Sequence, residues 1–124
     1  MDNLEGCRID EEFRNQLETS TSQTPITIIA TIRETFEVTG LLRNLQGYRR
    51  RSPEELQTRL AISEAETKMM EPVCKYLDEL GVQYSPFRAM HSVSAQMTPQ
   101  QILDFIKQPY VQIICPDAKL HLID

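Results

Sequence analysis

The run from Ile26 to Arg33 constrains the fold more than any other part of the chain. It reads Ile-Thr-Ile-Ile-Ala-Thr-Ile-Arg and follows Pro25. β-Branched residues of this density favour a strand. Every second residue is apolar and should face a core: Ile26, Ile28, Ala30 and Ile32. Because the intervening positions are mostly polar, we predict a half-buried strand of an antiparallel sheet.

A long helix should follow between Ser52 and Gly81. Ser52-Pro53-Glu54-Glu55 is a typical helix start, with a capping serine, a proline in the first turn and acids that suit the helix dipole. Gly81 is a typical stop, whereas Pro72 should kink or split the helix near Glu71. Apolar residues recur at helical spacing: Leu56, Leu60, Ile62, Ala65, Met69, Val73, Tyr76, Leu77 and Leu80.

The remaining elements complete a recognisable order. Residues 82–88 and 92–97 read as strands joined by a turn, residues 110–115 as a last strand. Thr98 opens a second helix, with Gln101 at the capping-box position. The order strand, helix, strand, strand, helix, strand predicts an α+β, ferredoxin-like (βαββαβ) fold, a four-stranded antiparallel sheet with two helices on one face. The uncovered face is a natural docking surface.

The chain divides into three parts. We expect a flexible N-terminal tail over residues 1–24, with a short helix around Glu11 to Leu17, because Thr19 to Thr24 is a polar tract. The folded domain is expected over residues 25–117, with an irregular excursion over residues 35–52 in which Gly40 to Leu45 could form a helical turn. Residues 118–124 form an extended C-terminal tail.

Composition sets limits on function. The 124 residues suffice for one domain, and 13 basic against 18 acidic residues give a net charge of −5. This balance disfavours non-specific nucleic-acid binding.

The sequence also bears on location. No apolar run approaches the ~18 residues of a membrane span. The acidic segment from Met1 to Glu12 does not resemble a signal peptide. Three widely spaced cysteines indicate free thiols and a cytoplasmic location, although a mature secreted chain remains an alternative.

No residues mark a catalytic or metal centre. Cys74, Cys115, His91 and His121 lack metal-ligand spacing, so we expect no metal. The four glycines are isolated, which excludes a phosphate-binding loop, and no pair of carboxylates is placed for acid–base work. We therefore expect a small binding or regulatory module that is no enzyme and needs no cofactor. A thiol redox sensor through Cys115 is a third interpretation.

Arg49-Arg50-Arg51, with Arg43 nearby, is the one cluster of positive charge. Such a run either binds an acidic partner or lies in a solvated loop.

Several strings resemble the inhibitor I9 family, the propeptides of subtilisin-like serine proteases and their stand-alone inhibitor relatives. They are the strand that begins at Pro25, the helix through Cys74-Lys-Tyr-Leu-Asp-Glu-Leu-Gly, and Val93-Ser-Ala-Gln-Met-Thr-Pro-Gln-Gln-Ile. The clearest is Ile106-Lys-Gln-Pro-Tyr-Val-Gln-Ile-Ile-Cys-Pro-Asp, which is similar to the ending of such propeptides.

The resemblance implies a mechanism. The open sheet face would pack on two surface helices of a protease, and Asp117 would cap one of them. The C-terminal tail would enter the active-site cleft as a substrate does. Leu120, His121, Leu122 and Ile123 would fill the four subsites before the scissile position, and Asp124 would lie just beyond it.

Two hypotheses about function follow. The first is a stand-alone propeptide-like inhibitor, or folding chaperone in trans, of a subtilisin-like protease. The second is a protein-interaction module unrelated to proteolysis, which pairs with another intracellular protein or with itself as a homodimer through the sheet. In that case Arg43, Arg49, Arg50 and Arg51 would carry the specificity.

Overall fold

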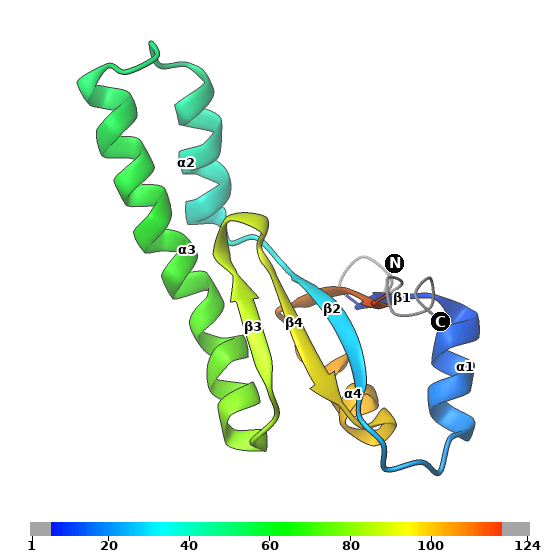
Figure 1. Ribbon diagram of the computed structural model, residues 1–124. Helices are drawn as coiled ribbons and strands as arrows, with labels where there is room; N and C mark the ends of the chain where they lie inside the picture. The colour runs from blue at the N-terminus through cyan, green and yellow to red at the C-terminus, as the bar shows by residue number, and fades with distance from the viewer. Residues whose placement is uncertain (1–5, 118–124) are drawn as a thin grey trace.

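The computed structural model describes residues 6–117 of the chain as a mixed α+β structure (Figure 1). The elements in chain order are β1 (Arg8–Ile9), α1 (Glu11–Thr19), β2 (Ile26–Ile32), α2 (Phe36–Gln46), α3 (Pro53–Leu80), β3 (Tyr84–Phe87), the 3-10 turn η2 (Arg88–Met90), β4 (Ser92–Met97), α4 (Pro99–Phe105) and β5 (Val111–Pro116).

Five strands, not the predicted four, make up the sheet of the described residues, in the order β1-β5-β2-β4-β3. The central strand β2 runs antiparallel to both β4 and β5, and β3 is antiparallel to β4. The additional strand β1 lies parallel to β5 and covers its outer edge. A two-residue strand carries no alternation of its own, so the sequence gives no warning of it.

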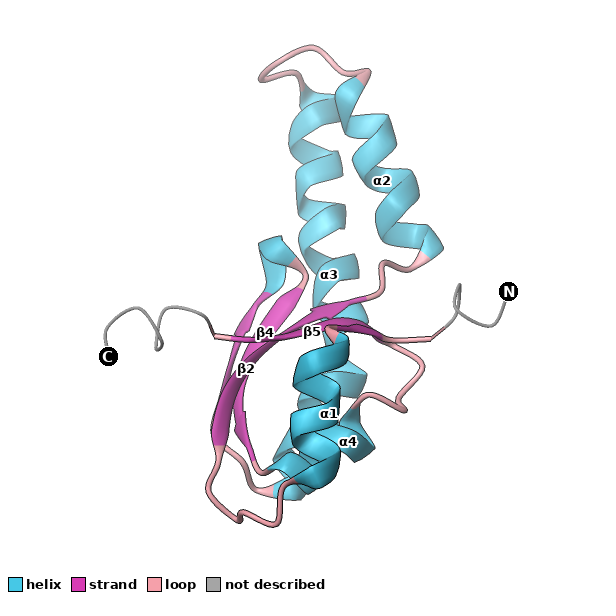
Figure 2. Cartoon of the chain, turned by 90° about the vertical axis from the view of Figure 1, so that its right-hand side faces the viewer, coloured by secondary structure: helices cyan, strands magenta, loops and turns pink. Residues whose placement is uncertain are grey.

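The core lies on one face of this sheet, as the alternation in β2 predicts. Ile28, Ala30 and Ile32 are buried, as are Val93, Ala95 and Met97 on β4. They pack with apolar residues of α1, α3 and α4. Figure 2 shows α1 and α4 on the same side of the sheet. The rings of Tyr76 on α3 and Phe105 on α4 stack at 5.5 Å and join these two helices.

The N-terminal segment contributes to this core, which corrects the expectation of a separate tail over residues 1–24. The expected helix is present as α1, capped by the side chain of Asp10. Phe13 and Leu17, four residues apart, lie on the face of α1 that is buried. They fix residues 11–19 against α4 rather than leaving them in solvent.

The segment 35–52 is also more regular than the expected irregular excursion. Most of it is the helix α2, capped by Thr35 and buried at Val38. α2 and the first half of α3 form a hairpin that projects beyond the sheet (Figure 1). Each helix supplies the apolar partner that the other needs, so α2 depends on tertiary packing that its own sequence hardly signals.

α3 is a single helix of 28 residues with Pro72 inside it, and the predicted split does not occur. Pro72 is exposed, so solvent can hydrate the carbonyl group that its missing N–H leaves without a helical partner. Both predicted ends are confirmed: Ser52 caps the N-terminus, and Gly81 ends the helix at φ 73°. None of the helices in residues 6–117 has the length and apolar character that crossing a membrane requires.

Candidate functional site

The face of the sheet opposite the helices carries the side chains that alternate with the core positions. We call it the outer face. The strand registers place the following residues on it: Thr27, Ile29, Thr31, Ser94, Gln96, Ile113 and Cys115. In Figure 2 none of the drawn helices of residues 6–117 lies over this side of β2, β4 and β5. Ile29 and Ile113 are half-buried, and small hydroxyl side chains surround them. A surface of half-buried isoleucines among small hydroxyl groups has a composition that suits contact with a protein partner.

The two edges of the outer face differ. At the β5 edge, β1 pairs with Ile113 and Ile114 in the middle of that strand. At the other edge, β3 contains Pro86, which has no N–H to offer to a further strand. Phe87 at the end of β3 is 47% exposed. Both edges are therefore blunted against sheet extension, and the outer face itself is the larger contact surface.

Asp117 directly follows β5 and is the last residue that the structure describes. Its backbone N–H donates to the carbonyl oxygen of Thr27 at 3.1 Å, so the pairing with β2 continues to this residue. The residue predicted to cap a protease helix is thus fixed beside the outer face. The predicted protease-binding residues Leu120, His121, Leu122, Ile123 and Asp124 lie outside the described residues.

The predicted interaction loop lies far from the outer face. We call Arg43, Arg49, Arg50 and Arg51 the arginine tip, because they are exposed at the end of the α2–α3 hairpin that points away from the sheet (Figure 1). At a rise of about 1.5 Å per residue, α3 alone is about 40 Å long. The structure therefore does not bring the arginine tip and Asp117 into one site.

The backbone of the arginine tip is firmly held. Arg51 has a left-handed conformation, with φ 63°. Its N–H donates to the carboxylate of Glu55 at 2.7 Å, and the N–H of Glu55 donates to the hydroxyl of Ser52 at 3.1 Å. These two hydrogen bonds, one to Arg51 and one to Ser52, close the loop onto the start of α3. The backbone at Arg51, from which the exposed arginine side chains project, therefore has a defined conformation.

Charge is strongly segregated between this hairpin end and the rest of the chain. Residues 43–59 contain five arginines and two glutamates, a net charge of +3 within a chain of −5. The other residues together carry −8. No carboxylate of residues 6–117 lies within ion-pair distance of the side chains of Arg43, Arg49 or Arg50. The arginine tip is thus an exposed basic surface, to which an acidic surface would be complementary.

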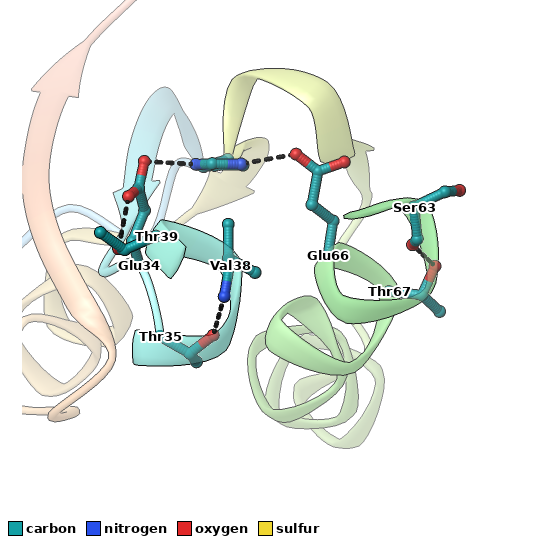
Figure 3. Close-up of polar contacts among 8 residues, drawn as sticks. Glu34, Thr35, Val38, Thr39, Ser63, Glu66 and Thr67 are labelled. Atoms are coloured by element: carbon teal, nitrogen blue, oxygen red, sulfur yellow. Dashed lines mark hydrogen bonds and ion pairs between the residues drawn. The ribbon is translucent and has the colours of Figure 1, made fainter. Parts of the chain in front are cut away.

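His91 forms a polar cluster that the sequence analysis missed. Its Nε2 lies 2.7 Å from Oε2 of Glu66, and its Nδ1 lies 3.1 Å from Oε2 of Glu34 (Figure 3). His91 and Glu66 are both buried. The second oxygen of Glu34 accepts a hydrogen bond from Thr39 at 2.8 Å. The cluster therefore ties the end of β2 to α2, to α3 and to the turn before β4.

This cluster holds separate elements of the fold together. Each ring nitrogen of His91 faces a carboxylate, so neither is left to take a proton from a substrate or to hold a metal ion. Among the residues that the structure describes, no group of three histidine, cysteine or acidic side chains could hold a metal. The sequence does contain one signal for this cluster. Glu66 is an acidic residue on the buried stripe of α3, between Ala65 and Met69. A carboxylate in that position requires a partner.

The three cysteines differ in their surroundings. Cys115 is exposed on the outer face opposite Ile29, whereas Cys7 and Cys74 are half-buried, and all three are free thiols. Burial raises the pKa of the Cys7 thiol to about 11 and also raises the pKa of Cys74. Neither of these two thiols has the lowered pKa that a reactive cysteine needs.

Comparison with known proteins gives no family for this chain. No protein-family model, no curated protein and no solved structure matches it. The function must therefore be inferred from the surfaces described above.

Proposed function

We propose that this protein binds a subtilisin-type serine protease in the manner of an I9 propeptide. The outer face would pack on the enzyme, and residues 118–124 would enter its active-site cleft. The protein would act as an inhibitor, as a folding chaperone in trans, or as both, with no catalytic activity, metal or cofactor of its own. We further propose a cytoplasmic location, which suits three unpaired thiols.

We also propose that β2, α3, β3, β4, α4 and β5 form a ferredoxin-like unit, to which β1, α1 and α2 are additions. Two features support this assignment. The four strands follow one another as β5-β2-β4-β3 with antiparallel pairing throughout. Along the chain, α3 connects β2 with β3 and α4 connects β4 with β5, as two split βαβ units require.

The observation that carries the functional proposal is the combination of the outer face with the position of Asp117, directly after β5. A partner seated on the outer face would have the C-terminal residues beside it, because the backbone of Asp117 is still hydrogen-bonded to Thr27 of the central strand β2. Recognition of this kind joins a broad, flat contact to an extended peptide, which supplies backbone hydrogen bonds and side chains for subsites.

An inhibition titration tests the proposal. The full chain would be mixed with a subtilisin and a chromogenic peptide, and compared with a chain that ends at Lys119. We expect the full chain to inhibit the enzyme. Removal of residues 120–124 should raise Ki about a hundredfold or more, because those residues would fill the subsites.

A matched pair of variants tests the outer face. Ile29→Asp, on the outer face, should weaken inhibition, whereas Phe36→Gln, which removes an exposed apolar side chain from α2, should leave it unchanged. Circular dichroism would show that each protein is folded. A folded full chain without inhibition, or a truncated chain that inhibits equally well, would contradict the proposal.

A second candidate function is a protein-interaction module that uses the arginine tip. The favouring observation is that Arg43, Arg49 and Arg50 are exposed and have no ion-pair partner among residues 6–117. Changing Arg49, Arg50 and Arg51 to glutamate should then abolish capture of an acidic protein from the source cell, while truncation at Lys119 should not. Self-association through the outer face is a variant of this function, and Ile29→Asp should abolish it.

A further inference from the structure

The end of the α2–α3 hairpin combines positive charge with exposed apolar side chains. Tyr48 directly precedes Arg49 in the loop and is 40% exposed, and Leu56 in the first turn of α3 is 55% exposed. At about 1.5 Å per residue, Leu56 lies about 5 Å along the axis from the start of α3 at Pro53. The basic and the apolar side chains therefore share the outermost part of the hairpin.

The acidic residues near the arginine tip do not cancel its charge. Glu55 is buried and lies 3.6 Å from Arg59, so this pair adds no net charge. Apart from this pair, residues 43–59 hold four arginines and one acid, the exposed Glu54. The next acids, Glu37 on α2 and Glu64 on α3, lie about 13 Å or more from the loop along their helices. That distance exceeds the Debye length of about 8 Å at physiological ionic strength, so their effect at the tip is largely screened.

The shape of this end favours a soft surface over a folded partner. The loop between α2 and α3 spans only residues 47–52, and the hairpin projects beyond the sheet (Figure 1). A stable protein interface usually takes about 20–30 residues on each side, which a narrow projecting end does not offer. A lipid headgroup layer can instead surround such an end, with phosphates for the arginines and acyl carbon for Tyr48 and Leu56.

We propose that the arginine tip, together with Tyr48 and Leu56, binds the surface of a membrane that contains anionic lipids. Charge complementarity selects this partner, because residues 43–59 carry +3. The other residues carry −8 and are repelled by the same surface, so the molecule would approach it with the tip first. Tyr48 and Leu56 would then enter the headgroup region.

This lipid surface takes the place of the acidic protein as the partner of the arginine tip. The proposal is independent of protease binding, since the hairpin projects away from the outer face (Figure 1). A protein held at a membrane by the tip would keep its outer face free for a second partner.

Co-sedimentation of the full chain with phospholipid vesicles tests the proposal. We expect binding to phosphatidylcholine vesicles that contain about 30% phosphatidylserine, no binding to pure phosphatidylcholine, and weaker binding as salt rises. Arg49→Gln combined with Arg50→Gln should lower the partition constant about 25-fold, which is about fivefold for each arginine. Arg8→Gln combined with Arg14→Gln removes the same charge from β1 and α1 and should leave binding unchanged.

A fluorescence measurement reports whether the tip enters the headgroup layer. The chain contains no tryptophan, so Tyr48→Trp provides a single reporter at the arginine tip. Its emission should shift to the blue when the anionic vesicles are added, because the ring leaves water for a less polar layer. Phe36→Trp is the matched control: position 36 is 99% exposed at the other end of α2, and its emission should not change.

Three results would overturn the proposal. One is a full chain, folded by circular dichroism, that does not bind the anionic vesicles at low salt. Another is binding that the Arg8 and Arg14 changes weaken as much as the Arg49 and Arg50 changes do. The third is binding to polyglutamate as tight as that to the vesicles, with no blue shift from Tyr48→Trp, since an acidic protein would then be the partner. Inhibition of a protease by the full chain is measured separately, so the two proposals can fail independently.

Discussion

At the scale of single residues, His91 explains how the projecting hairpin is fixed to the sheet. Its backbone carbonyl accepts from the N–H of Ile32 at 2.7 Å, so the residue is held by β2 as well as by its ring contacts. Its φ of 52° turns the chain sharply from η2 into β4. The side chain is thereby aimed between Glu34 and Glu66, which lie on different elements.

Removal of the imidazole should therefore cost substantial stability. His91→Ala leaves the buried side chain of Glu66 without its hydrogen-bond partner, and a buried polar group left unsatisfied typically costs about 1–3 kcal/mol. Glu34→Gln should cost at most about 1 kcal/mol, because Glu34 is 42% exposed and water can replace the contact. Urea unfolding measures both changes. Equal losses for the two variants would contradict the assignment of Glu66 as the principal partner.

At the scale of elements, local signals predicted the ends of helices and strands well. Ser52, Thr98 and Gly81 cap helices as expected, because capping involves only residues close in the chain. β4 has the predicted bounds, and β2 and its burial follow from alternation. The first of the candidate surfaces, the outer face, was likewise implied by the strand pattern.

The missed elements depend on partners far along the chain. α2 contains Val38, Thr39 and Gly40, which are weak helix formers, and its stability comes from α3. The bond from His91 to Glu66 spans 25 residues. Leu56 and Leu60 match the helical period of core residues, but the sequence could not show that α3 extends beyond the sheet.

Gly40 offers a direct test of α2. A Cβ added there would meet no atom within 4 Å, and the residue has no positive φ. Gly40→Ala should therefore stabilise the protein by about 0.5–1 kcal/mol through helix propensity. Gly81→Ala is the matched control: space is also free, but its φ of 73° disfavours a side chain, so it should destabilise. Thermal unfolding compares them, and a destabilising Gly40→Ala would argue against α2 as a helix.

At the scale of the whole molecule, the three thiols report on separate surfaces. Cys7 lies beside β1, Cys74 on α3 and Cys115 on the outer face. Because a thiolate is the reacting species, a raised pKa slows labelling at a given pH. Burial raises the pKa of Cys7 to about 11, so this thiol is almost wholly protonated at pH 8 and gains reactivity only as the pH approaches that value.

Labelling of the native protein with a thiol reagent at about pH 8 should therefore modify Cys115 first and Cys7 slowly, with Cys115→Ser removing the fast phase. The same measurement locates a partner. A protease seated on the outer face would cover Cys115, which is opposite Ile29 in the sheet, and should suppress the fast phase without changing the slow one. Cys115 that stays fully reactive in a protease complex would place the contact on another surface.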